Sequence, residues 1–204
     1  MANDHKFWDR MAKRYARTPV SDEAAYQEKL RKTRAVLTPE MSVLEFGCGT
    51  GSTAIALAPD VQDYLATDIS GEMLGIARGK AEGIENLRFE NMRLEAVARP
   101  EGGYDAVLGH SILHLLPDKE AAIAQVFTLL KPGGVFVSST TCMAKGGVLK
   151  PLLWTGNKLG LLPHIGFFSA DSLVKAVEAA GFSIEDRWQP KPKSALFLIA
   201  RKPL

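Results

Sequence analysis

The sequence contains only two cysteines, Cys48 and Cys142, and they lie too far apart to form a metal-ligand motif. So few cysteines indicate no disulfide framework, which favours a reducing compartment. The chain also lacks the basic and then apolar start of a signal peptide, and its most apolar stretch, residues 147–168, is interrupted by lysine and proline. We therefore expect a cytoplasmic protein with no transmembrane segment.

An excess of one charge is also missing. The chain has 25 lysine and arginine residues against 23 aspartate and glutamate residues, a formal net charge of +2. Because the basic residues are scattered, we expect no surface built to bind nucleic acid. The 204 residues, 46% of them hydrophobic, suffice for one core, so we expect a single domain over residues 1–204 that is a monomer or a homodimer.

Strand-like and helical segments alternate through the middle of the chain. Apolar runs predict strands at 42–46, 63–66, 87–90, 104–109 and 135–138, and the intervening segments predict helices at 52–58, 71–80 and 118–130. Helices at about 4–17 and 21–37, the second capped by Ser21, precede them. This alternation is typical of a parallel sheet with helices on both faces, that is, an α/β fold.

The end of the chain departs from this alternation. A helical segment begins at Ser169 and stops at Gly181. The stretches "SIEDRW" and "SALFLIARK" that follow read as two strands separated by a short proline-rich turn. We expect them to form an antiparallel hairpin at the edge of the parallel sheet.

The stretch "VLEFGCGTGSTA" places Gly47, Gly49 and Gly51 between the first strand and a helix. Such a turn presents free backbone N–H groups, and glycine lets a ligand approach the backbone closely. The alternative is a tight turn that binds nothing. The spacing differs from the G-x-G-x-x-G of dinucleotide sites, and Glu45 would repel a phosphate. The pattern therefore favours a nucleoside-like ligand without phosphates.

Asp68 ends the second predicted strand, about 20 residues after the glycine loop. A carboxylate at this place can accept hydrogen bonds from both hydroxyls of a ribose. The alternative is that Asp68 or Ser70 only caps the helix that begins at Gly71. The combination with the glycine loop favours a role in ligand binding.

These motifs resemble those of a known superfamily. "VLEFGCGTG", "ATDIS" with "EMLGIAR", "YDAVLGHSILHLLPD" and "LLKPGGVFV" are similar to the successive motifs of class I methyltransferases that use S-adenosylmethionine. The resemblance runs from Phe7 to Arg201 and is closest to the group that includes ubiquinone and menaquinone biosynthesis methyltransferases. It implies a Rossmann-like, seven-stranded, mostly parallel sheet, the cofactor S-adenosylmethionine and a small-molecule acceptor.

The resemblance also implies which residues bind the cofactor. The loop of Gly47, Cys48 and Gly49, with Glu45 nearby, would hold the methionine part, and Asp68 the ribose. The other positions that match are Ile69 and Met73 against the adenine and Tyr15 over the methionine end, although plain packing of a helix equally explains Tyr15 and Trp8. Relatives commonly have a Gly-Asp pair after the third strand, but this chain has Met92 and Arg93 near that place. Adenine recognition would then fall to a backbone N–H or to Arg93.

Chemistry is expected at the end of the fourth strand, where ligands gather in open α/β sheets. Gly109 would leave room for the sulfonium end of the cofactor. His110 stands where relatives that methylate amines carry the Asn or Asp that holds the acceptor, and a histidine could act there as a general base. His114 is a second candidate, with a structural role as its alternative, and Cys142 is expected to be a small buried residue.

The acceptor site is expected under a lid at residues 140–168, with residues 1–40 forming a cap. Apolar side chains of this lid suit a small apolar or aromatic acceptor. They are Trp154, Leu161, Leu162, Ile165, Phe167 and Phe168. Lys150 and Lys158 beside apolar residues keep peripheral membrane contact and a lipid head-group acceptor open. A non-catalytic S-adenosylmethionine-binding protein is another alternative, and the glycine spacing and Glu45 count against a nicotinamide-dependent oxidoreductase.

Overall fold

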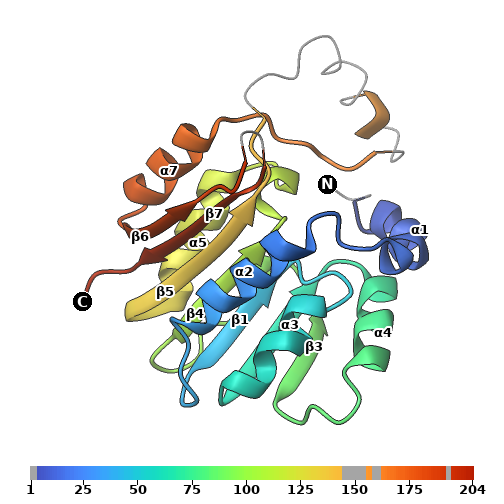
Figure 1. The fold of residues 1–204 in the computed structure, drawn as a ribbon, viewed down its shortest axis with the longest axis horizontal. Helices are drawn as coiled ribbons and strands as arrows, with labels where there is room; N and C mark the ends of the chain where they lie inside the picture. Colours follow the sequence, from blue (N-terminus) through green and yellow to red (C-terminus); the bar gives the residue numbers. More distant parts are fainter. Residues whose placement is uncertain (1–3, 144–154, 158–161, 192–193) are drawn as a thin grey trace.

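The computed structural model describes residues 4–143, 155–157, 162–191 and 194–204, and in it seven strands form one sheet in the order β3-β2-β1-β4-β5-β7-β6 (Figure 1). Strands β1 to β5 pair in parallel, and β7 runs antiparallel between β5 and β6. This confirms the predicted Rossmann-like sheet with an antiparallel C-terminal hairpin. The strands are β1 (Ser42–Phe46), β2 (Asp63–Asp68), β3 (Leu87–Asn91), β4 (Tyr104–His110), β5 (Leu130–Thr140), β6 (Ser183–Trp188) and β7 (Leu196–Arg201).

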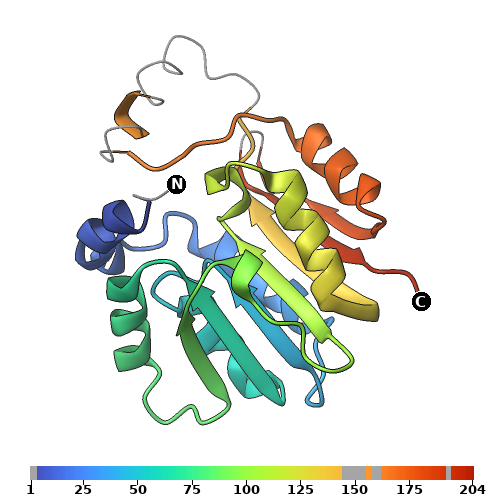
Figure 2. The same cartoon turned by 180° about the vertical axis from the view of Figure 1, so that it is seen from behind.

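Helices cover both faces of this sheet, as the two opposite views show (Figures 1 and 2). Side chains of α2 (Glu23–Arg34) and α3 (Ser52–Leu57) pack on one face, with Leu30 and Leu57 in its core. Those of α5 (Lys119–Leu129) and α7 (Ala170–Ala179) pack on the other. Near the β3 edge, α1 (Asp4–Arg17) packs against α4 (Gly71–Lys80).

Several element boundaries differ from the sequence prediction by a few residues, and two of these differences have identifiable reasons. The cap of α2 is Asp22 rather than Ser21, because the Asp22 carboxylate accepts a hydrogen bond from the backbone N–H of Ala25 at 3.0 Å. Strand β5 begins at Leu130 instead of Val135, because Leu130 pairs with Tyr104 and a shift in register before Ala106 accommodates the intervening residues. Ser169 caps α7 as predicted.

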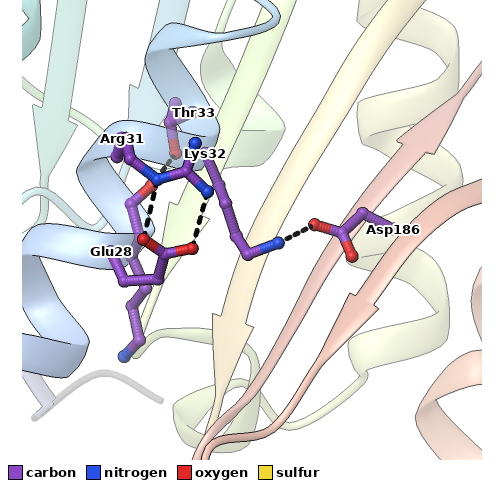
Figure 3. Close-up of polar contacts among 6 residues, drawn as sticks. Glu28, Arg31, Lys32, Thr33 and Asp186 are labelled. Carbon is purple, nitrogen blue, oxygen red and sulfur yellow. Dashed lines mark hydrogen bonds and ion pairs between the residues drawn. The ribbon is translucent and has the colours of Figure 1, made fainter.

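Helix α2 is fastened to the C-terminal hairpin by charged side chains (Figure 3). The ammonium of Lys32 lies 2.7 Å from a carboxylate oxygen of Asp186 on β6 and 5.9 Å from the centroid of the Trp188 ring. At the start of α2, Asp22 forms an ion pair with Lys191 at 2.9 Å. Both ends of α2 are therefore held against the β6–β7 hairpin, which fixes the face that α2 turns toward the sheet.

The strand order reverses its direction between β1 and β4, at the centre of the sheet. Strand β1 lies between β2 and β4, so the chain leaves β1 in one direction and β4 in the other, and ligand sites of open α/β sheets form at such a point. Among the described residues, no helix is long and apolar enough to cross a membrane.

Candidate active site

A cavity of about 820 Å³ opens at the carboxyl ends of β1, β2, β4 and β5. Sites for a single small ligand usually measure about 300 to 1,000 Å³, so this cavity is near the upper end of that range. It brings together twelve of the thirteen candidate residues predicted from the sequence: Tyr15, Glu45, Gly47, Cys48, Gly49, Asp68, Ile69, Met73, Met92, Arg93, His110 and His114. Gly109 is not among the lining residues.

The floor of the cavity is the glycine loop after β1, where the backbone is left-handed. Gly51 has φ +75°, and a Cβ atom there would lie 2.9 Å from the Cβ of Ala77, so this glycine is required by packing against α4. Gly49 has φ +55°, and an added Cβ would meet only Tyr15, at 4.0 Å. Its missing side chain therefore keeps the floor open toward the cavity.

Asp68 joins the glycine loop to the end of β2. One carboxylate oxygen accepts the backbone N–H of Gly49 and the other that of Ser70, both at 2.8 Å. The cap of α4 is Ser70, whose hydroxyl accepts the N–H of Met73 at 3.1 Å. A carboxylate offers about four acceptor positions, so the backbone hydrogen bonds leave Asp68 able to accept from a further donor, such as a ribose hydroxyl.

The hydroxyl of Ser70 has a second function, because it binds α1 to α4. It donates to the carboxylate of Asp9 at 2.6 Å. This contact places Tyr15 of α1 beside Gly49, with its ring half-exposed and its edge toward Trp8 at a centroid distance of 6.4 Å. The N-terminal helix thus lies over the glycine loop.

Glu45 is a buried acid beneath the same loop. It is 2% exposed and accepts a hydrogen bond from the hydroxyl of Tyr64 at 2.8 Å. Burial raises the pKa of Glu45 to about 8, and burial likewise raises the pKa of Asp68 against the opposing effect of its backbone hydrogen bonds. A nearby cation would favour the ionised form of both acids, and the Asp68 carboxylate would repel a phosphate. The donor and acceptor set therefore fits a positively charged nucleoside such as S-adenosylmethionine.

The remaining wall on the β2–β3 side is largely apolar. Ile69, Met73 and Met92 line it, and Met73 is 2% exposed. The backbone N–H of Met92 already donates to the carbonyl of Glu90 at 3.1 Å, which removes that group as an adenine donor. Arg93 lines the cavity at this place.

Gly109 was expected to leave room for the sulfonium end of the cofactor, but its lack of a side chain has a different consequence in the structure. A Cβ atom at Gly109 would lie 2.5 Å from the Cζ atom of Phe46, so the space that this glycine leaves is filled by the Phe46 ring of the neighbouring strand. The glycine permits β1 and β4 to pack; it does not open the cavity.

His110 lies at the end of β4 with its ring stacked on Phe197, at a centroid distance of 6.5 Å and an interplanar angle of 12°. Burial, together with the positive charge of Lys29, lowers the pKa of His110 to about 4. The imidazole is therefore neutral at pH 7. Its Nε2 atom is buried and has no hydrogen-bond partner among the described residues.

His114 lies on the short turn Leu113–Leu115 and also lines the cavity. Its Nδ1 atom is buried and has no partner within the described ranges, and burial lowers its pKa. Its backbone carbonyl accepts the N–H of Gly166 at 2.7 Å. Cys142 packs beside the core and is not a lining residue.

The predicted lid is described only in part. Pro163 and His164 line the cavity, whereas Phe168 is buried in the core of the α5 and α7 face, so this aromatic side chain supports the domain instead of covering an acceptor. Trp154, Leu161, Lys150 and Lys158 lie outside the described residues.

The sequence analysis missed Lys29, Ser139 and Thr141, which line the cavity on the β4–β5 side. For Lys29, the spacing of residues along the helix could have identified its position. It lies three residues after Tyr26 and one before Leu30, on the stripe of α2 that faces the sheet and ends at the buried Thr33. Burial lowers the pKa of this lysine, which Asp22 partly opposes.

Comparisons with known proteins agree with this geometry. A profile of a family described as "Methyltransferase domain" matches residues 13–186. The chain is 33% identical over 100 residues to the uncharacterized methyltransferase YcgJ of Bacillus subtilis, covering 48% of this chain and 40% of that protein. It is 28% identical over 152 residues to a ubiquinone biosynthesis O-methyltransferase of Acinetobacter baylyi, covering 71% of this chain and 64% of that protein. The chain thus spans less than two thirds of either relative.

Among solved structures, the complex of DhpI with SAH has the same fold. Its TM-score is 0.78 at 24% sequence identity, and the match covers 99% of this chain and 96% of that one.

Proposed function

The chain belongs to the class I S-adenosylmethionine-dependent methyltransferase superfamily, and we propose that it transfers the methyl group of this cofactor to a small apolar or aromatic acceptor. The observation that carries the proposal is the hydrogen bond between Asp68 and Gly49 at the floor of a cavity large enough for a cofactor and a small acceptor together.

The cofactor would occupy the β1–β2–β3 side of the cavity. Asp68 would accept the ribose hydroxyls, and the apolar side chains of Ile69 and Met73 would contact the adenine. The glycine loop would carry the methionine part, with Glu45 below it as an acid that a bound cation would help to ionise. Tyr15 would cover this end, with the first forty residues acting as a cap.

The acceptor would occupy the β4–β5 side, next to His110. When bound, the cofactor supplies a methyl group made electrophilic by its sulfonium. The chain then has to align the acceptor and exclude water, and alignment of this kind is worth about 7 to 11 kcal/mol. Neutral His110 would accept a hydrogen bond from an acceptor hydroxyl and take its proton while that oxygen bonds to the methyl carbon and the bond from this carbon to sulfur breaks.

Two alternatives are weaker. A non-catalytic binding protein would need no acceptor space, yet the cavity continues from the glycine loop to His110 and His114. A lipid head-group methyltransferase rests on Lys150 and Lys158, which lie outside the described residues.

Calorimetric titration with S-adenosylmethionine, S-adenosylhomocysteine and NADH tests the cofactor. We expect micromolar binding of the first two and none of NADH. If the folded protein binds neither adenosyl compound, the glycine loop is only a structural turn and not a cofactor site.

The role of His110 is tested separately, by transfer of a labelled methyl group to a panel of small phenols and amines. We expect His110→Gln to lower turnover of hydroxyl acceptors about 10²-fold or more, with the affinity for S-adenosylhomocysteine retained. His114→Gln, on the short turn that follows β4, is the matched comparison. Unchanged turnover in His110→Gln would remove the general base from the mechanism.

A further inference from the structure

We propose that Lys29 binds an anionic oxygen, such as a carboxylate, on the methyl acceptor, so that this enzyme selects small acidic molecules with an apolar or aromatic body. The inference rests on the proposed function and names the substrate class of the same site. It is carried by the position of Lys29 in the cavity and by the polar groups beside it.

Lys29 lies on the inward-facing stripe of α2 and lines the cavity. No carboxylate of the described ranges lies within 4.0 Å of its ammonium group. The acid that interacts with it electrostatically is Asp22, and that carboxylate is engaged by Lys191 and by the N–H of Ala25. Because a partly buried charge is costly unless it is paired, Lys29 gains from an anion supplied by a ligand.

The helix that carries Lys29 is held in a fixed orientation. One turn further on, Lys32 reaches Asp186 on β6, whereas Arg31 turns to Glu28 on the helix surface (Figure 3). Two lysines three residues apart therefore have different roles. Lys32 anchors α2 to the hairpin, and Lys29 remains available to a ligand in the cavity. An ammonium group presented by a fixed helix loses little entropy when a ligand binds.

Two other polar side chains, those of His110 and Ser139, line the cavity together with Lys29. The positive charge of Lys29 contributes to the lowered pKa of His110, and His110 pairs in register with Ser139 across β4 and β5. Within the described part of the chain, the hydroxyl of Ser139 and the Nε2 atom of His110 are both buried without a hydrogen-bond partner. An unpaired buried polar group is destabilising, so a polar ligand group that completes these hydrogen bonds would be favoured.

Opposite charges lie at different places along the cavity. Asp68 lies at the end of β2, and Lys29 lines the cavity together with His110, at the end of β4. A cationic cofactor beside Asp68 and an anionic acceptor beside Lys29 would each meet opposite charge. Pro190 and Ala195 also line the cavity and suit an apolar body.

The test uses calorimetry on the full chain saturated with S-adenosylhomocysteine at neutral pH. The probes are matched acids and primary amides: benzoate and benzamide, cinnamate and cinnamamide, indole-3-acetate and indole-3-acetamide. We expect the acids to bind about tenfold or more tightly than their amides, because a hydrogen bond to a charged group contributes that much. Lys29→Met should remove the preference and Lys29→Arg should keep it. Arg31→Met removes a surface charge from the same helix and should change nothing.

Equal binding of acids and amides by the wild-type protein, no binding of any acid, or a preference that survives in Lys29→Met would each overturn the assignment. All variants should bind S-adenosylhomocysteine with wild-type affinity, which also shows that they are folded. Failure of the wild-type protein to bind S-adenosylhomocysteine would instead overturn the proposed function.

Discussion

The carboxylate of Asp68, at the end of β2, accepts the backbone N–H of Gly49, in the loop after β1, at 2.8 Å. This hydrogen bond connects the carboxyl ends of two neighbouring strands, where both strand ends line the cavity. One side chain therefore shapes the glycine loop and at the same time presents acceptor positions to a ligand.

Replacing Asp68 with alanine should weaken binding of S-adenosylhomocysteine by about 2 to 4 kcal/mol, because hydrogen bonds to a charged group would be lost. Isothermal titration calorimetry measures this directly. Asp63→Ala, at the opposite end of β2 and paired with Arg88 on the surface, is the control and should bind normally. Wild-type affinity in Asp68→Ala would show that the ribose assignment is wrong.

Alanine at Gly49 and at Gly51 should have different effects. Gly51→Ala brings a Cβ to 2.9 Å from that of Ala77 and should lower the melting temperature more strongly. Gly49→Ala has open space and pays only for its left-handed backbone, about 1 to 2 kcal/mol, but its methyl group enters the ligand floor. Thermal unfolding and calorimetry on both variants separate stability from binding. If Gly49→Ala binds S-adenosylhomocysteine as tightly as the wild type, the loop does not contact the ligand.

Glu45 should make the free protein less stable as pH rises. Its pKa is about 8 when folded, above the value of about 4.3 in an unfolded chain. Between these values the unfolded state ionises and the folded state does not, so stability falls by about 1.4 kcal/mol per pH unit. Below the lower value and above the upper one this contribution is constant.

Glu45→Gln removes that titration and keeps an acceptor for Tyr64. Relative to the wild type, its free energy of unfolding should therefore increase between about pH 5 and about pH 8, by up to about 4 kcal/mol, as measured by urea denaturation. A constant difference across this range would mean that Glu45 is ionised in the folded protein.

The two ion pairs of Figure 3 should differ in strength. The side chains of Lys32 and Asp186 are 19% and 31% exposed and join α2 to β6, whereas that of Arg31 is 66% exposed and bonds within its own helix. Double-mutant cycles on urea unfolding should give a coupling of about 1 kcal/mol for Lys32 with Asp186 and about 0.3 kcal/mol for Arg31 with Glu28. Similar couplings would contradict the anchoring role of Lys32.

His110 should remain neutral across the physiological range. With a pKa of about 4, its ring proton signals in the NMR spectrum should not shift between about pH 5.5 and pH 8, whereas an ordinary histidine titrates near pH 6.5. Loss of the signals in His110→Gln gives their assignment. A midpoint near pH 6.5 would show that the ring is solvated.

Much of the fold was predictable because it depends on local pattern. The strand Ser42–Phe46 and the helix Gly71–Lys80 have the predicted bounds, since apolar periodicity and a serine cap mark them in the sequence. The prediction for the cap of α2 was wrong, because Ser21 and Asp22 are both suitable caps and local chemistry does not distinguish them. Twelve of the thirteen candidate site residues line one cavity, because strand ends in a parallel sheet meet at one edge.

By itself, then, the sequence determined the alternating α/β order, the left-handed glycine loop and the acid that ends β2, because each follows from short-range spacing and backbone geometry. Only the tertiary structure decided that the Phe46 ring fills the gap at Gly109, that Tyr64 bonds Glu45, and that Lys29 and His110 line the same cavity. The members of each of these pairs are far apart along the chain. They meet through the order of the strands and the rotation of α2 against the sheet, which no local pattern fixes.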